Sequence, residues 1–156
     1  MSETNEEPGI LLAHHVGITV SDLDRSIALF TEVLGYELMN RAGRDPDMIS
    51  RITGIPGAEI EVAYVGRPNS VVELLCYRSP ENRGKIAGRN CDSGHTHLAF
   101  DVRGIEAVIE TLRGRGFTPR SEPVVNPSGP NGGAKVVYLD DEDRLVLELI
   151  ERPQRI

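Results

Sequence analysis

Four side chains that can bind a divalent metal occupy matching places in the two halves of this chain. His15 opens the apolar run "HVGITV", and His97 opens the similar run "HLAFDV". Glu73 lies inside "VVELL" and Glu148 inside "VLELI", where an ionised carboxylate is costly unless it is paired, exposed or bound to a metal. Two imidazoles and two carboxylates suit Zn, Ni, Co, Mn or Fe(II), one ion per site. The alternative interpretation is that the histidines are solvated strand residues and the glutamates lie on exposed edges.

An internal repeat carries this pairing. Residues 15–30, "HVGITVSDLDRSIALF", align without a gap with residues 97–112, "HLAFDVRGIEAVIETL", so that Gly17 falls on Ala99. Each copy first alternates between faces, which is typical of a strand, and then takes helical spacing up to a closing glycine. A small residue, glycine or alanine, leaves room beside each imidazole. The recurrence of His and Glu at matching positions favours a metal site.

The two predicted helices differ in their caps. Ser21, with Asp24 three residues on, resembles a capping box in which Asp replaces Glu. In the second copy Arg103 and Gly104 stand where Ser21 and Asp22 stand, which predicts a weaker cap.

Each half is predicted to be a strand, a helix and about three further strands, which gives an α+β fold of two tandem βαβββ modules. We expect a flexible tail at residues 1–10 and a single domain at 11–156. Module 1 covers about 11–80 and module 2 about 93–152. The stretch "NRAGRDPDMISRITGIPG" is predicted to be a long loop, and "SPENRGKIAGRNCDSG" joins the modules.

Composition excludes several classes of function. The 156 residues are 39% hydrophobic and 26% charged, as in an ordinary globular protein, and the net charge of −7 argues against a nucleic-acid partner. No apolar run is long enough to cross a membrane, and the acidic start is not typical of a secretory signal. Cys76 and Cys91 are expected to be free thiols in a reducing cytoplasm.

The residues quoted above resemble the vicinal oxygen chelate superfamily, also called the glyoxalase/bleomycin-resistance/dioxygenase fold. The resemblance covers nearly the whole chain and rests on "HHVGITVSDLDRSIALFTEVLGYEL", "VVELLCY", "GHTHLAFDV" and "YLDDEDRLVLELIE". It implies curved mixed sheets around a central metal-binding cavity, and a homodimer. In glyoxalase I-like lyases and methylmalonyl-CoA epimerase-like enzymes, metal ligands occupy the positions of His15, Glu73, His97 and Glu148. One departure is "DEDR" at 141–144, where the family often has Asp-Pro-Asp-Gly.

Three reaction classes are implied by the resemblance. Extradiol-type dioxygenases and fosfomycin-type thiol transferases use three protein ligands, so the additional carboxylate of Glu73 favours proton transfer by an isomerase, epimerase or lyase. Non-catalytic drug-binding members commonly lack the metal ligands and stack drugs on aromatic walls, whereas this chain has no Trp and is 4% aromatic. We therefore expect proton transfer next to a metal-bound carbonyl or enolate oxygen.

The sequence offers several candidates for the catalytic base and two interpretations of the charged loops. Glu148 or Glu73 could leave the metal and accept a proton, as the resemblance implies. Glu61, in "AEIEVAYVG", is a third candidate, with an exposed edge carboxylate as the alternative. Basic residues in the loops could bind a small anionic substrate or could simply be solvated. His95 aligns with Ala13, so the repeat gives it no ligand role, although it could line the pocket mouth.

Overall fold

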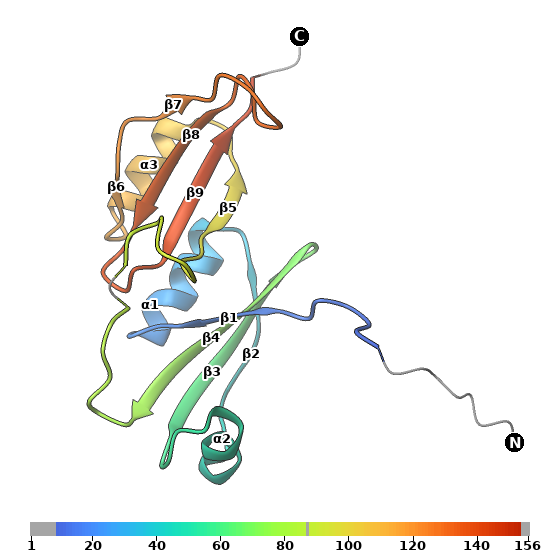
Figure 1. The fold of residues 1–156 in the computed structure, drawn as a ribbon, viewed down its shortest axis with the longest axis vertical. Helices are drawn as coiled ribbons and strands as arrows, with labels where there is room; N and C mark the ends of the chain where they lie inside the picture. The colour runs from blue at the N-terminus through green and yellow to red at the C-terminus, as the bar shows by residue number, and fades with distance from the viewer. Residues whose placement is uncertain (1–8, 87, 154–156) are drawn as a thin grey trace, which may run out of the picture. The chain divides into compact units, whose positions relative to one another are not determined.

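The computed structural model describes residues 9–86 and 88–153 and divides into two compact units (Figure 1). The first unit comprises the described parts of 1–31 and 35–77, and the second comprises 32–34 and the described parts of 78–156. Most of the predicted tail at 1–10 lies outside the described residues. Gly9 and Ile10 are described and form no helix or strand.

The first unit is built on a four-stranded mixed sheet. In chain order its elements are β1 (Val16–Thr19), α1 (Leu23–Ala28), the π-helical turn η1 (Leu29–Val33), β2 (Glu37–Gly43), α2 (Pro46–Thr53), β3 (Glu59–Arg67) and β4 (Ser70–Ser79). The strand order is β1-β4-β3-β2, with β1 parallel to β4 and β2 antiparallel to β3. The parallel pair places the start of β1, next to His15, beside Val72 near the start of β4.

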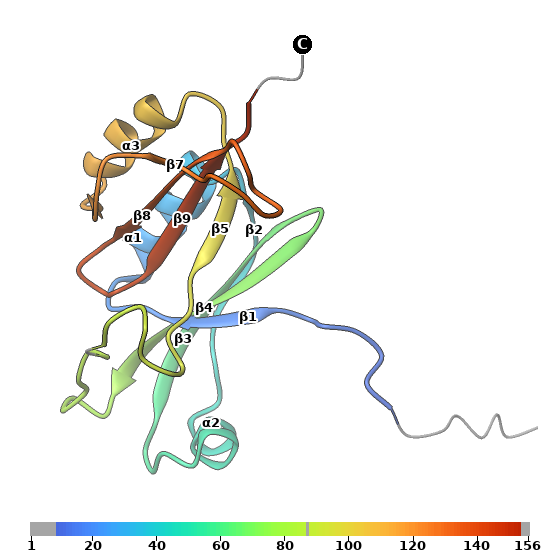
Figure 2. The same cartoon turned by 45° about the horizontal axis from the view of Figure 1, so that its top comes forward.

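The second unit repeats this plan. Its elements are β5 (Leu98–Asp101), α3 (Ile105–Arg113), β6 (Thr118–Pro119), β7 (Val124–Val125), β8 (Lys135–Asp140) and β9 (Val146–Glu151). The strand order is β5-β9-β8-β6, β7 also pairs with β8, and β5 runs parallel to β9. Figure 2 shows α3 against one face of this sheet. The predicted α+β class with curved mixed sheets is confirmed.

Each helix buries an apolar stripe against its own sheet. The helical spacing in the second copy predicts an apolar stripe of Ile105, Ile109 and Leu112. This stripe is buried in α3, where Ile105 and Leu112 are inaccessible to solvent and Ile109 is 5% exposed. Full burial of such a side chain stabilises the fold by about 1.5–3 kcal/mol. In the first unit α1 packs on β3, and Phe30 in the η1 turn that follows is fully buried. The opposite face of each sheet is therefore left for the predicted ligands.

Two predictions about the first unit are wrong in detail. The cap of α1 is Asp22, whose side chain accepts a hydrogen bond from the Arg25 backbone N–H at 2.9 Å, and not a box of Ser21 and Asp24. The predicted long loop contains α2, because Asp45 caps it, Pro46 occupies its first turn and Gly54 ends it at φ 71°. Proline inside the start and glycine just past the end is a helix signature that the loop interpretation overlooked.

The cap of α3 comes from a distant strand. Gly104 at its N-terminus offers no side chain, and the backbone N–H groups of Gly104 and Ile105 donate instead to Oε1 of Glu151, the last residue of β9. A carboxylate there also interacts favourably with the helix dipole. The contact joins the end of β9 to the chain that has just left β5.

The "DEDR" turn before β9 is made without glycine. Arg144 takes the left-handed φ of 67° and donates to Oδ2 of Asp140 at 2.8 Å and to the Gly88 carbonyl at 2.7 Å. Asp141 Oδ1 accepts from the backbone N–H groups of Asp143 and Leu145. These bonds hold a conformation that glycine normally supplies.

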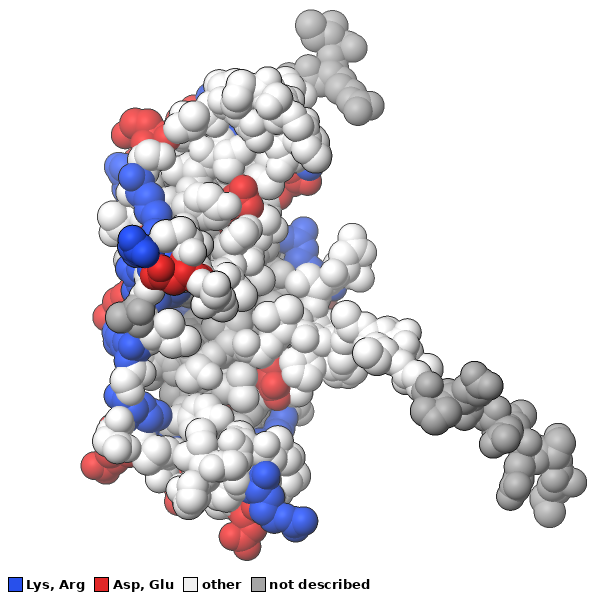
Figure 3. Space-filling view, viewed as in Figure 1, with Lys and Arg blue, Asp and Glu red and all other residues white. Residues whose placement is uncertain are grey.

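The predicted free state of the two cysteines is confirmed. Cys76 and Cys91 are free thiols. Over residues 9–86 and 88–153, no helix combines the length and apolar character needed to cross a bilayer. On the face drawn in Figure 3, basic and acidic side chains lie beside one another. Ion pairs in the second unit include Lys135–Glu106 and Arg113–Glu110.

Candidate metal centre

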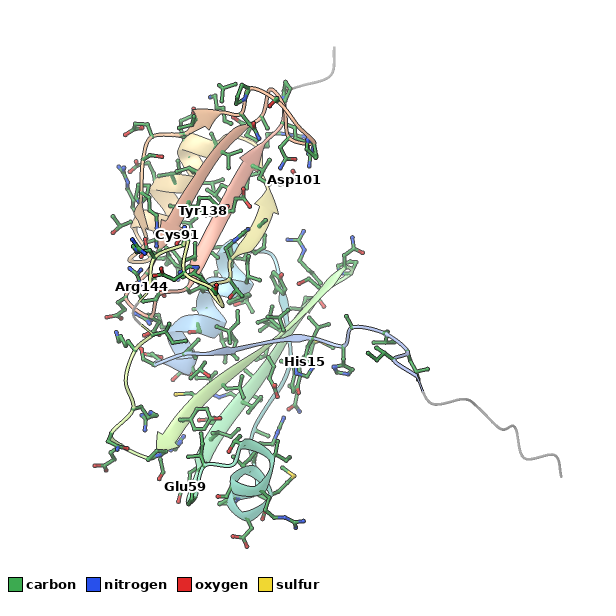
Figure 4. All side chains as sticks on the ribbon, viewed as in Figure 1. His15, Glu59, Cys91, Asp101, Tyr138 and Arg144 are labelled. Carbon is green, nitrogen blue, oxygen red and sulfur yellow. The ribbon has the colours of Figure 1, made fainter. Side chains whose placement is uncertain are left out.

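The first unit brings His15 and Glu73 together on one face of its sheet. His15 immediately precedes β1, as Figure 4 shows, and its Nε2 lies 3.1 Å from Oε2 of Glu73 on β4. Gly17 is the register partner of Glu73, and a Cβ added there would lie 3.8 Å from Glu73 Oε2 and 3.3 Å from a Leu75 methyl carbon. A small residue is therefore what leaves room for this pair.

Tyr64 completes the first group of side chains. Its hydroxyl donates to Oε1 of Glu73 at 2.6 Å, and its ring meets the His15 ring edge-on, with centroids 5.4 Å apart. The bond to the carboxylate raises the pKa of the Tyr64 phenol above its ordinary value of 10.0, with burial adding to the rise and nearby Arg44 opposing it. Tyr64 thus stays a hydrogen-bond donor at neutral pH, and a half-buried guanidinium lies beside it.

The other ring nitrogen of His15 also has a neighbour. Nδ1 of His14 lies 2.7 Å from Nδ1 of His15, and the two rings meet edge-on. Because a histidine that binds metal through one nitrogen is oriented by a hydrogen bond to the other, this contact leaves Nε2 of His15 as the nitrogen available to bind a metal.

The second unit repeats the group almost unchanged. Nε2 of His97 lies 3.1 Å from Oε2 of Glu148, and Ala99, which aligns with Gly17, is the register partner of Glu148. Tyr138 pairs directly with Glu148 across the sheet, and its ring meets the His97 ring edge-on at 5.2 Å. Burial is the main cause that raises the pKa of the Tyr138 phenol, followed by the charge of Glu148 and a hydrogen bond to it.

The tyrosines were missed from the sequence. A signal was present, because "AYVG" and "VYLD" each place a tyrosine on the strand before the glutamate strand. Apolar strands that contain a tyrosine are common, and only strand register shows that these two hydroxyls face the carboxylates.

The pairs fit a divalent ion by donor type and by separation. Ligand atoms about 2.1 Å from a metal and at right angles to each other are about 3 Å apart, which is close to the 3.1 Å seen in both pairs. The same separation also suits a hydrogen bond, so each pair is held together without an ion. Within either unit the described residues offer one such pair and no group of three or more His, Cys, Asp or Glu side chains able to hold a metal.

Glu61, the third candidate base, does not join these groups. It lies on β3 as predicted, but it is three residues from Tyr64 and therefore faces the opposite side of the strand. There its Oε1 accepts from Nε of Arg41 at 2.8 Å, and Arg41 also bonds Asp24 of α1. This double pairing raises the pKa of Arg41 and leaves Glu61 as an ion-pair partner on the helix side of the sheet.

His95 and the basic loop before it lie in the second unit, outside the histidine–glutamate pair. The backbone N–H of His95 donates to the Asp92 carbonyl at 3.2 Å, in a turn that also holds Arg89 against the Asp92 carboxylate. Arg83 bonds backbone carbonyls within the same loop, and Lys85 bonds the Glu142 carbonyl. These contacts favour a structural role for the loop charges over substrate binding.

Comparisons with known proteins show the family of this chain. A family model described as the Glyoxalase/Bleomycin resistance protein/Dioxygenase superfamily matches residues 14–138. A 2-epi-5-epi-valiolone epimerase from Actinomyces sp. is 35% identical over 94% of this chain and 82% of its own length. A lactoylglutathione lyase from Arabidopsis thaliana is 31% identical over 88% of this chain, which spans only 43% of that relative.

Solved structures show the same fold. A glyoxalase family protein from Bacillus cereus superposes with a TM-score of 0.76, at 23% identity, over 98% of this chain and all of that one. The fosfomycin resistance protein FosX from Mesorhizobium loti gives a TM-score of 0.56 at 17% identity, over 91% of this chain and 92% of that one. At these identities the likeness concerns the fold alone.

Proposed function

We propose that this chain, which belongs to the glyoxalase/bleomycin resistance protein/dioxygenase superfamily, is a divalent-metal-dependent enzyme that moves a proton next to a carbonyl group. The proposed ligands of one ion are His15, Glu73, His97 and Glu148. The observation that carries the proposal is the recurrence of one histidine–glutamate pair, at 3.1 Å, in both units. Solvated strand residues would have no reason to recur with the same partner, the same separation and a small register neighbour.

The proposed chemistry divides between the ion and the chain. A bound divalent ion would supply Lewis acidity to a substrate oxygen and so acidify the adjacent C–H bond. The side chain that accepts the proton is Glu73 or Glu148, whose side chains are 17% and 15% exposed and lie beside the ligand histidines. Their position between the tyrosines and the imidazoles keeps both carboxylates on the face where the substrate would lie.

The substrate proposed is a small ketone rich in hydroxyl groups. The support is the 35% identity, over nearly the whole chain, with a protein named for epimerising a cyclitol ketone. Epimerisation next to a ketone is removal and return of one proton, which requires a base, such as a carboxylate, and no second substrate. Arg44, half-buried beside the Tyr64 hydroxyl, offers a place for an anionic or oxygen-rich group of the substrate.

A lyase acting on a hemithioacetal is the second candidate. Its support is the 31% identity with a plant lactoylglutathione lyase. The homodimer and the cytoplasmic location expected from the sequence stay predictions.

Metal content after reconstitution with Ni, Co, Mn, Zn or Fe(II) tests the proposal. Wild-type protein is expected to retain close to one ion per chain, and His15→Ala and His97→Ala are expected to lose it. His95→Ala is the matched control, because it removes a histidine two residues from His97 that lies outside the pair. Absence of metal from the wild type, or equal loss from all three variants, would contradict the ligand assignment.

Solvent deuterium exchange then tests the reaction. If the protein is an epimerase, NMR is expected to show deuterium incorporated next to the carbonyl of 2-epi-5-epi-valiolone. No thiol needs to be added. Turnover of methylglyoxal that requires glutathione would support the lyase instead. A metal-loaded protein that exchanges neither substrate and consumes oxygen with a catechol would overturn proton transfer.

A further inference from the structure

Two tyrosines flank the proposed ligands in the same way, and they differ in how firmly they hold the carboxylate. Each ring lies edge-on against a ligand histidine, at 5.4 Å for Tyr64 and 5.2 Å for Tyr138. Each comes from the strand next to the glutamate strand, β3 beside β4 and β8 beside β9. The internal repeat therefore includes a third side chain in addition to His and Glu.

The Tyr64 hydroxyl uses one oxygen of Glu73 and leaves the other free to face the histidine. It donates to Oε1 at 2.6 Å, while Oε2 lies 3.1 Å from Nε2 of His15. A hydrogen bond from a phenol to a carboxylate is charge-assisted and therefore short and directional. It restricts rotation of the carboxylate, so that only Oε2 is presented on the histidine side.

We infer that Tyr64 and Tyr138 are positioning residues of the proposed metal centre, and that Tyr64 fixes Glu73 more firmly than Tyr138 fixes Glu148. The inference rests on the proposed function, since it concerns ligands of the proposed ion. Its basis is the hydroxyl–carboxylate bond of 2.6 Å in the first unit and the matching edge-on ring in the second. Neither tyrosine is assigned contact with the metal or the substrate.

The first group has a further support that the second lacks. Nδ1 of His15 lies 2.7 Å from Nδ1 of His14. Over residues 9–86 and 88–153, no corresponding partner of His97 Nδ1 occurs. We therefore expect the first pair to be the more rigid half of the centre.

Tyrosine-to-phenylalanine substitution isolates the hydroxyl, because the ring and its edge-on contact remain. Loss of such an outer partner typically costs 10–100-fold in metal affinity, and Tyr64→Phe is expected to fall in that range. Tyr138→Phe is expected to lose less. Tyr36→Phe is the control, since it removes another tyrosine hydrogen bond in the first unit, which is donated to Ser70 at 2.9 Å and not to a proposed ligand.

Metal affinity is measured by competition between each folded variant and a chelating dye for Co(II). The expected order of affinity is wild type equal to Tyr36→Phe, then Tyr138→Phe, then Tyr64→Phe. If wild type binds Co(II) and Tyr64→Phe binds it equally well, the positioning role is overturned while the proposed function stands. If wild type binds no metal, the proposed function itself has failed.

A spectroscopic measurement tests whether these tyrosines lie beside the bound ion. The chain has no Trp and four Tyr, so its fluorescence comes from tyrosine, and a bound Co(II) ion quenches the nearest rings. Saturating Co(II) is expected to quench wild type and Tyr36→Phe strongly, and the double variant Tyr64→Phe with Tyr138→Phe weakly. Equal quenching of all proteins at saturation would show that these tyrosines do not lie beside the ion.

Discussion

The carboxylate of Glu151 is expected to stabilise the second unit through the N-terminus of α3. Helix α3 begins at Ile105 after a glycine that has no side chain to cap it, and two backbone N–H groups converge on one Glu151 oxygen. The other oxygen lies 3.7 Å from Nζ of Lys135. Because Glu151 ends the strand that carries Glu148, the cap also ties strand β9 to the chain leaving β5.

The size of the effect follows from these contacts. A side-chain cap is worth about 0.5–2 kcal/mol, and a hydrogen bond to a charged group about 1.5–3 kcal/mol. The Glu151 side chain is 21% exposed, so solvent screening reduces the upper figure. We expect Glu151→Ala to lower the free energy of unfolding by about 2 kcal/mol. Glu151→Gln keeps an acceptor but loses the charge that favours the helix N-terminus, and should cost about 1 kcal/mol.

Thermal and urea unfolding followed by far-UV circular dichroism measures these differences. For a chain of this size, 2 kcal/mol corresponds to a fall in Tm of roughly 4–8 °C. Glu110→Ala is the control, since Glu110 is an exposed residue of the same helix and pairs with Arg113. If Glu151→Ala is no less stable than Glu110→Ala, the carboxylate does not cap α3 and the reasoning is refuted.

Three further predictions concern the ion pairs, the turn and the metal. Nζ of Lys135 bonds Glu106, which lowers the pKa of Glu106 from its ordinary 4.5 and raises that of Lys135 from its ordinary 10.5. The stability difference between wild type and Lys135→Met should therefore be largest between pH 4.5 and pH 10.5, the ordinary pKa values of the two groups. It should shrink as pH falls through the depressed pKa of Glu106 and as pH rises through the raised pKa of Lys135; a Tm difference that is flat from pH 3 to pH 11 would contradict this. Arg144 takes φ 67°, so Arg144→Gly should be more stable in urea than Arg144→Ala by about 1 kcal/mol, although both lose the bonds to Asp140 and Gly88. Co(II) at about 100 times its Kd should raise the free energy of unfolding by about 2.7 kcal/mol, a rise in Tm of roughly 5–11 °C, in wild type and not in His97→Ala.

Local patterns in the chain predicted the strands beside the histidine–glutamate pairs. Alternation followed by helical spacing located β1, α1, β5 and α3, because the two periods expose different faces to the core. The same patterns misplaced the α1 cap by one residue and left α2 inside a loop. Both errors concern residues that mark the start of a helix, Asp22 for α1 and Asp45–Pro46 for α2. Other polar residues nearby could equally have been read as the cap.

The sequence by itself determined the repeat, the sheet class and the identity of one histidine and one glutamate per half. These follow from local periodicity and from the cost of burying a charge, both of which are visible along one strand. Only the tertiary structure decided which side chains surround each pair. Tyr64 rather than Glu61 faces Glu73, because residues three apart on a strand point to opposite faces, and the sequence does not say which face is covered by the helix. Glu151 caps α3 because strand pairing brings together residues that are far apart in the sequence. No pattern within a short stretch of sequence predicts such a contact.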